Sequence, residues 1–134
     1  MPAKSKKRAL VSIAALHVTV QVTHGYSHVV EGIQNTPLQL VFILPVITIA
    51  PLFAVYIAWE INLRKGAALF ALSMLAAFLF GYSLHFVIDS PDFHSNVIGE
   101  YASVFFYSAL NLAILEFVGF VFGAYIWLVP HNDA

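Results

Sequence analysis

The segment ALVSIAALHVTVQVTHGYSHVVE, residues 9–31, is an apolar run of membrane-spanning length that carries a stripe of polar side chains. A helix needs about 20 predominantly apolar residues to cross a bilayer. The polar positions follow one another at steps of four, three, four and three residues, which places them on one helix face. They are His17, Gln21, His24, His28 and Glu31. Because polar groups cost free energy in lipid, this face should point into a helix bundle.

The whole chain has the composition of an integral membrane protein. Its 134 residues are 60% hydrophobic and 10% charged, with a mean hydropathy of +0.84, whereas soluble domains have roughly 25% charged residues. A soluble fold would leave the long apolar runs exposed to water. The sequence contains no cysteine, which excludes disulfides, cysteine-ligated zinc and thiolate-held iron–sulfur clusters.

Four apolar runs predict an all-α bundle of four transmembrane helices that forms a single domain over residues 1–134. The expected helices lie near residues 9–31, 38–62, 67–89 and 101–129. The connections are short and rich in turn-forming residues, so neighbouring helices should be antiparallel. Pro45 and Pro51 lie inside the second run and favour a kink there, with Thr48 as a partner for a freed carbonyl.

The basic residues predict the orientation of this bundle. All six Lys and Arg residues lie either before the first apolar run or between the second and third runs. Four helices would put both groups on one side of the membrane, and the positive-inside rule makes that side the cytoplasm. We therefore expect a multi-pass protein of the plasma membrane with both termini in the cytoplasm. The outer side gathers histidines and carboxylates, which would attract cations.

Histidines of the first and third runs lie at matching heights near this outer side. At about 1.5 Å of rise per residue, His24 and His28 lie about 24 and 30 Å above Arg8, and His85 lies about 32 Å above Arg64. His24 and His28 are also spaced so that both can reach one metal ion. Convergence of these rings at one depth predicts a metal site.

The outer cluster offers nitrogen and carboxylate donors without sulfur, which suits copper, zinc or non-haem iron. Asp92 and His94, in the loop after the third run, could fold over the same point. The expected ligands are His24, His28, His85, Asp89 and His94. Glu31, His17, Gln21 and Glu116 are expected to support these ligands or to form a proton path, with Glu31 or His94 as a fifth ligand.

A second polar group lies deeper, in the middle of the fourth run. Glu116 is near the height of Gln21, with His17 about one turn below, so a contact of Glu116 with either residue is expected. Such a contact either locks two helices together or belongs to a proton or ion conductor. Gly119 and Gly123 form a small-xxx-small step that favours close helix packing.

The stretch Leu84-His85-Phe86-Val87-Ile88-Asp89, followed by His94, is similar to a part of the membrane subunits of copper-dependent methane and ammonia monooxygenases. In those subunits an acid and two histidines cluster near the outer end of a transmembrane helix. The order of acid and histidines differs here. The resemblance implies a copper site within a larger enzyme.

Together these features favour a small membrane protein with an outward-facing histidine and carboxylate metal site. We expect it to be a subunit of a larger metal-dependent oxidoreductase, either copper-monooxygenase-like or respiratory. Its partners would be the lipid bilayer and other membrane subunits, and no nucleic acid. Three alternatives stay open: a structural subunit without a cofactor, a proton or ion conductor using His17, Gln21 and Glu116, and a haem b carrier with His24 or His28 opposite His85.

Overall fold

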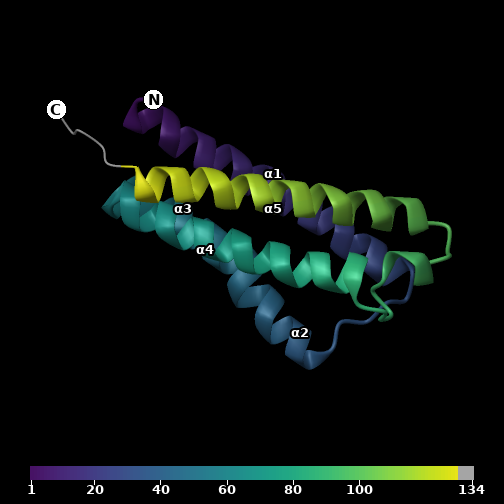
Figure 1. Cartoon of the computed structure of the whole chain (residues 1–134). Coiled ribbons are helices and arrows are strands. Elements are labelled where there is room, and N and C mark those ends of the chain that lie inside the picture. The colour runs from purple at the N-terminus through teal and green to yellow at the C-terminus, as the bar shows by residue number, and fades with distance from the viewer. Residues whose placement is uncertain (130–134) are drawn as a thin grey trace.

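A computed structural model of the chain describes residues 1–129, which form a bundle of long helices without strands (Figure 1). The C-terminus, expected in the cytoplasm, lies outside the described residues, as does the end of the single domain expected over residues 1–134. The elements in chain order are α1 (Ala3–Val30), α2 (Pro37–Phe42), η1 (Ile43–Ile49), α3 (Ala50–Tyr56), η2 (Ile57–Ile61), α4 (Leu63–Tyr82), η3 (Ser83–Val87), η4 (His94–Asn96) and α5 (Ala102–Leu128).

Within residues 1–129, three helical spans are long and apolar enough to cross a membrane: Pro37–Ile61, Leu63–Val87 and Ala102–Leu128. They correspond to the second, third and fourth expected helices. The first expected helix is present as α1, but its polar stripe lowers its hydropathy and it is not among these spans. It also begins at Ala3, before the apolar run. An apolar pattern marks only the part of a helix that suits lipid, and basic residues extend α1 beyond that part.

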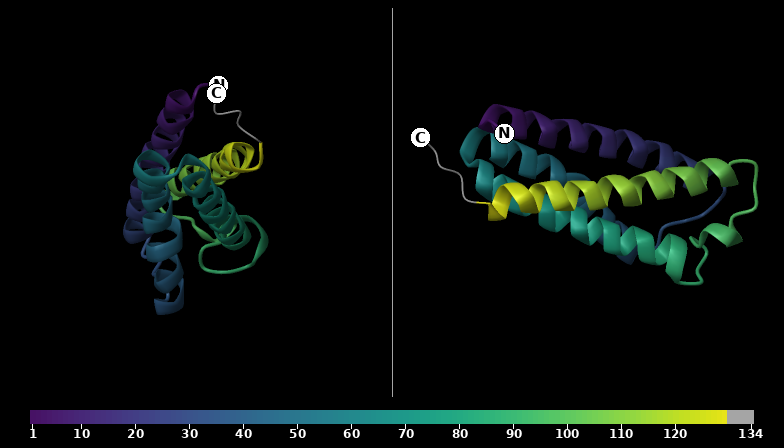
Figure 2. Two further views of the ribbon diagram at one scale, coloured as in Figure 1. Left: turned by 90° about the vertical axis from the view of Figure 1, so that its left-hand side faces the viewer. Right: turned by 45° about the horizontal axis from the view of Figure 1, so that its top comes forward.

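Helix α1 runs along the full length of the bundle. Near its start, the Lys7 ammonium donates a hydrogen bond to the Trp59 carbonyl at 2.8 Å. Past its other end, the Glu31 carboxylate accepts one from the Tyr101 backbone N–H. Because Trp59 and Tyr101 mark opposite ends of the other helices, all four helical rods share the same two ends (Figure 2). All six Lys and Arg residues belong to one of them, which we name the basic end; the other is the histidine end, with His24, His28, His85 and His94.

The second rod bends where its prolines lie. Pro45 has no N–H to donate, and the chain adopts the wider π-helical geometry in η1. The Thr48 hydroxyl donates to the Ile43 carbonyl at 3.2 Å, which supplies the expected partner for a carbonyl of the distorted turn. Beyond this point α2 leans away from the other helices (Figures 1 and 2).

Small residues let the helices pack closely elsewhere. A Cβ added at Gly123 of α5 would lie 3.0 Å from the Ala67 carbonyl oxygen of α4, and one at Gly119 would lie 3.0 Å from the Met74 side chain. The close helix packing expected for this glycine pair is therefore present. Gly66 at the start of α4 lies even closer to the backbone of Ala58 than these two glycines lie to their neighbours. The half of the bundle nearer the basic end is closely packed, and its core includes the buried side chains of Leu10, Phe70 and Ile126.

Candidate metal centre

Three buried imidazoles converge at the histidine end. His24 and His28 project from the same face of α1, and His85 approaches from η3. The Nε2 atom of His24 lies 3.1 Å from Nε2 of His28 and 3.2 Å from Nε2 of His85. In a tetrahedral site with metal–nitrogen bonds of 2.0–2.1 Å, the nitrogens are about 3.3 Å apart. One ring nitrogen from each histidine lies within 4.8 Å of the others, so the group could hold a metal ion.

Hydrogen bonds on the far side of two rings decide where their protons lie. His85 Nδ1 faces the Asp92 carbonyl at 2.9 Å and must donate to it. The Ser108 hydroxyl donates its single proton to the Phe105 carbonyl at 3.1 Å, so we assign it as the acceptor from His24 Nδ1 at 2.9 Å. A neutral imidazole carries one N–H. The Nε2 atoms of His24 and His85 therefore face each other as two lone pairs, an arrangement that a cation between them would stabilise.

The third ring, His28, is aimed at the same point. Its Nδ1 is buried and has no hydrogen-bond partner among the described residues, and Asp92 Oδ1 lies 3.9 Å away. Placing the proton on Nδ1, toward this carboxylate, leaves the Nε2 lone pair directed at His24. All three Nε2 atoms then present lone pairs to one small volume. This is the donor arrangement that a metal ion requires.

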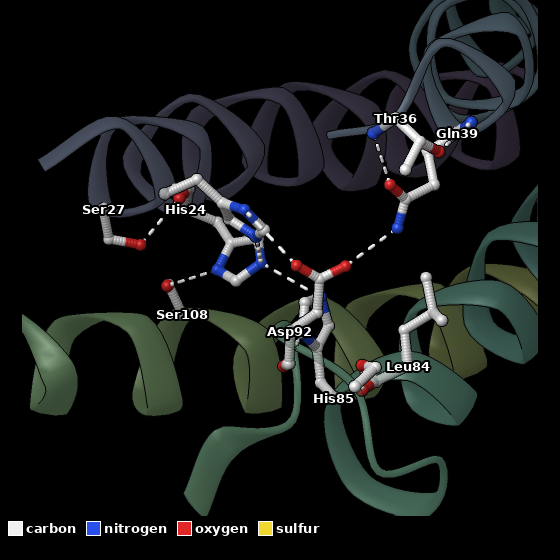
Figure 3. Close-up of polar contacts among 10 residues, drawn as sticks. His24, Ser27, Thr36, Gln39, Leu84, His85, Asp92 and Ser108 are labelled. Carbon is white, nitrogen blue, oxygen red and sulfur yellow. Dashed lines mark hydrogen bonds and ion pairs between the residues drawn. The ribbon is translucent and has the colours of Figure 1, made fainter. Parts of the chain in front are cut away.

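Asp92 is itself held in place by the start of α2 (Figure 3). It is 4% exposed, and its Oδ2 accepts a hydrogen bond from Gln39 Nε2 at 2.9 Å. Gln39 also closes a capping box with Thr36, in which each residue's backbone N–H donates to the other's side-chain oxygen. No pattern in the sequence predicted that Gln39 contacts the site. The Thr36-x-x-Gln39 pattern marks a helix start but does not reveal the second contact of the amide.

Two of the expected ligands lie apart from the three imidazoles. Asp89 is exposed and accepts a hydrogen bond from Asn96 at 2.9 Å. His94 is half-buried, and its Nδ1 donates to the backbone carbonyl of His85 at 2.9 Å. Helical geometry ends at Val87, so Asp89 does not share a helix face with His85.

Two residues of the α1 stripe, expected to support the ligands or to form a proton path, make contacts between helical elements. Glu31 binds the Tyr101 backbone and packs so closely on Gly99 that no side chain would fit there. Gln21 donates to the Thr48 hydroxyl of η1 at 2.7 Å. Both contacts hold α1 against other elements. Neither joins the hydrogen bonds around the three imidazoles.

The expected contact between His17 and Glu116 is present. His17 Nε2 lies 3.1 Å from Glu116 Oε1, and both side chains are buried. The pair lies about 10 Å from the imidazole cluster along α1, since seven residues separate His17 from His24. A buried hydrogen bond of this kind is consistent with a structural contact that holds α1 against α5, and equally with a step in a proton path.

Comparison of the chain with models of protein families, with curated proteins and with solved structures found no match.

Proposed function

We propose that this protein binds one transition-metal ion through the Nε2 atoms of His24, His28 and His85. The observation that carries the proposal is the pair of assigned lone pairs, on His24 and His85, that face each other at 3.2 Å. In the absence of a positive charge such a contact is repulsive, and burial would not favour it. A metal ion converts it into two bonds.

The chemistry of the donors limits the choice of metal. Three imidazoles without sulfur suit copper, zinc or non-haem iron. Three protein ligands also leave a coordination position for water or substrate, as in catalytic zinc sites. Haem b fits less well. Two histidines that bind its iron would have nitrogens about 4 Å apart on opposite sides of the ring, whereas the Nε2 atoms of His24 and His85 are 3.2 Å apart. Asp92 would balance charge and orient His28.

The proposal includes a topology in which α1 is a fourth membrane-spanning helix. Its two ends contact the two ends of the rods that qualify as spans, so it has the same depth as they do. The positive-inside rule then puts the basic end in the cytoplasm and the metal site near the outer surface of the plasma membrane.

We further propose that the protein works as a subunit of a larger membrane oxidoreductase. An open position on a copper or iron ion supports redox chemistry. Asn111, in the middle of α5, is exposed on the bundle surface, and its side chain donates to the Tyr107 carbonyl at 2.8 Å. A polar side chain at this depth favours a protein neighbour over lipid.

Metal content tests the central claim. The protein is purified without a histidine tag, and copper, zinc and iron are measured by elemental mass spectrometry. We expect about one ion per chain, and a loss of most of it in His28→Ala. His94→Ala is the matched control, because it removes a nearby imidazole whose nitrogens contact the His85 carbonyl and Ser95.

The result that would overturn the assignment is a folded, monodisperse wild-type protein that neither contains nor takes up metal. It would favour the structural or proton-conducting alternatives. Equal metal loss in His94→Ala and His28→Ala would indicate that the metal site lies closer to the loop that carries His94.

A further inference from the structure

A cavity of about 320 Å³ lies beside the three histidines. It is enclosed by α1, η1, α4 with η3, and α5, and its lining includes His24, His28 and His85. Gln21, Thr48 and Glu116 line it farther toward the basic end, and most of the remaining lining is apolar. Ligand sites typically measure roughly 300–1,000 Å³ and combine apolar walls with a few polar groups. This cavity has the size and lining of a small ligand site.

The sequence keeps this space open with small residues. Ala77 and Gly81, one turn apart on α4, line it together with Ala109 and Ala113, one turn apart on α5. A Cβ added at Gly81 would meet only Glu116 Oε2, at 3.9 Å, and one at Gly25 would meet nothing within 4 Å. The π-helical turn of η1 forms the facing wall.

The exposure of lining residues on α1 and η1 places an opening of the cavity between these two elements. Among its lining residues, Val22 of α1 is 68% exposed and Leu44 of η1 is 55% exposed. Leu44 belongs to a membrane-spanning segment, and Val22 lies on α1 between Gln21 and His24. Exposed apolar side chains at this depth contact lipid chains rather than water. A molecule dissolved in the bilayer would reach the histidines through this opening without crossing the outer surface.

We propose that this cavity binds a small, mostly apolar molecule with a single oxygen donor, which enters from the lipid and directs its oxygen to the open position of the metal. The inference rests on the proposed function, because the metal supplies the anchor for that oxygen. The apolar walls accommodate the body of such a molecule. The polar lining groups Gln21, Thr48, Asp92 and Glu116 already bond to other groups of the protein, which leaves the metal as the anchor for the polar end. Charged or strongly hydrated molecules would lose their water in this cavity without enough partners.

Cobalt(II) provides a coloured probe for the test. The untagged protein is first freed of bound metal with a chelator and loaded with cobalt in lipid nanodiscs. It is then titrated with 2-naphthol and separately with azide, and the visible absorption of the ion is followed. Azide needs little room and reports an open coordination position. 2-Naphthol needs the cavity as well. In the wild type we expect both to change the cobalt spectrum in a saturable manner.

Two variants fill the cavity without touching a histidine. Gly25→Leu places a side chain in the open space on the α1 side, and Gly81→Leu places one on the α4 side. Both remove a glycine from a helix, so neither lowers helix propensity. We expect each to weaken 2-naphthol binding at least tenfold while the azide response persists. Leu79→Phe, at a lipid-facing position of α4 that is 55% exposed, is the control and should leave both responses unchanged.

The outcomes separate the two proposals. A folded, metal-free protein that binds no cobalt refutes the proposed metal centre. A cobalt protein that responds to azide but not to 2-naphthol overturns the ligand assignment alone. So does a 2-naphthol response that survives in both cavity-filling variants.

Discussion

At the residue scale, the Ser108 hydroxyl decides which nitrogen of His24 is free to bind metal. It accepts from His24 Nδ1 and donates to the Phe105 carbonyl. Ser108→Ala would leave Nδ1 without an acceptor and let the proton move to Nε2. Loss of such a partner typically lowers metal affinity 10–100-fold. We expect a decrease of about this size, measured by competition with a chelator of known affinity.

The chain offers a matched control for this substitution. Ser73 on α4 is also buried and donates to a carbonyl three residues earlier, that of Phe70, at 3.0 Å, but the hydrogen bonds around the imidazoles do not include it. Ser73→Ala should change stability about as much as Ser108→Ala and leave metal affinity unchanged. Equal affinities in the two variants would contradict the proton assignment at His24.

Spacing and height predicted which histidines approach one another, but not which acid accompanies them. His24, His28 and His85 could be placed because helical rise and periodicity fix their depth and face. Asp89 and Asp92 lie beyond the point where helical geometry ends, so periodicity no longer applies to them. The loop puts Asp92 beside His28 and Asp89 beside Asn96. A loop conformation depends on tertiary contacts such as that of Gln39, which the sequence pattern does not encode.

At the element scale, the packing of α5 on α4 depends on Gly123. A Cβ there would lie 3.0 Å from the Ala67 oxygen and 3.1 Å from the Ala71 Cα, and these backbone atoms cannot rotate away. Gly123→Ala should therefore separate the helices and cost about 1–3 kcal/mol of unfolding free energy. Thermal or SDS unfolding of the protein in detergent measures this change.

Gly25→Ala is the control at this scale, because its added Cβ meets no atom within 4 Å. Removing a glycine from a helix stabilises it by up to about 1 kcal/mol. The two substitutions should thus shift the unfolding transition in opposite directions. A stabilised Gly123→Ala protein would show that α4 and α5 are not in this close contact.

The helices themselves follow from the sequence, whereas their irregular turns do not. Apolar length and turn residues predicted four helical rods, and Pro45 and Pro51 predicted a bend in the second. The bend takes the form of a π-helical segment, η1, preceded by α2, which leans outward, and Thr48 of η1 bonds both Ile43 and Gln21. The π-helical segment η1 forms one wall of the cavity, which is why the apolar pattern alone did not reveal the cavity.

At the scale of the whole molecule, the contacts at both ends of α1 support the proposed topology, in which α1 crosses the membrane beside the other rods. If the three apolar rods span the bilayer and α1 runs beside them from end to end, residues 1–8 and residue 34 lie on opposite sides. If α1 instead lay outside the bilayer, both segments would be on the side where the second rod begins. The two topologies thus differ in the side that holds the N-terminus.

The absence of cysteine makes this difference directly measurable. Ser5→Cys and Gln34→Cys each introduce a single thiol at an exposed position, near the basic end and the histidine end respectively. A membrane-impermeant maleimide applied to intact cells should label Gln34→Cys and should label Ser5→Cys only after the membrane is opened. Labelling of both thiols in intact cells would show that α1 does not span the bilayer. It would also place the three histidines at a water-exposed surface, where the lateral opening of the cavity could not admit a molecule from lipid.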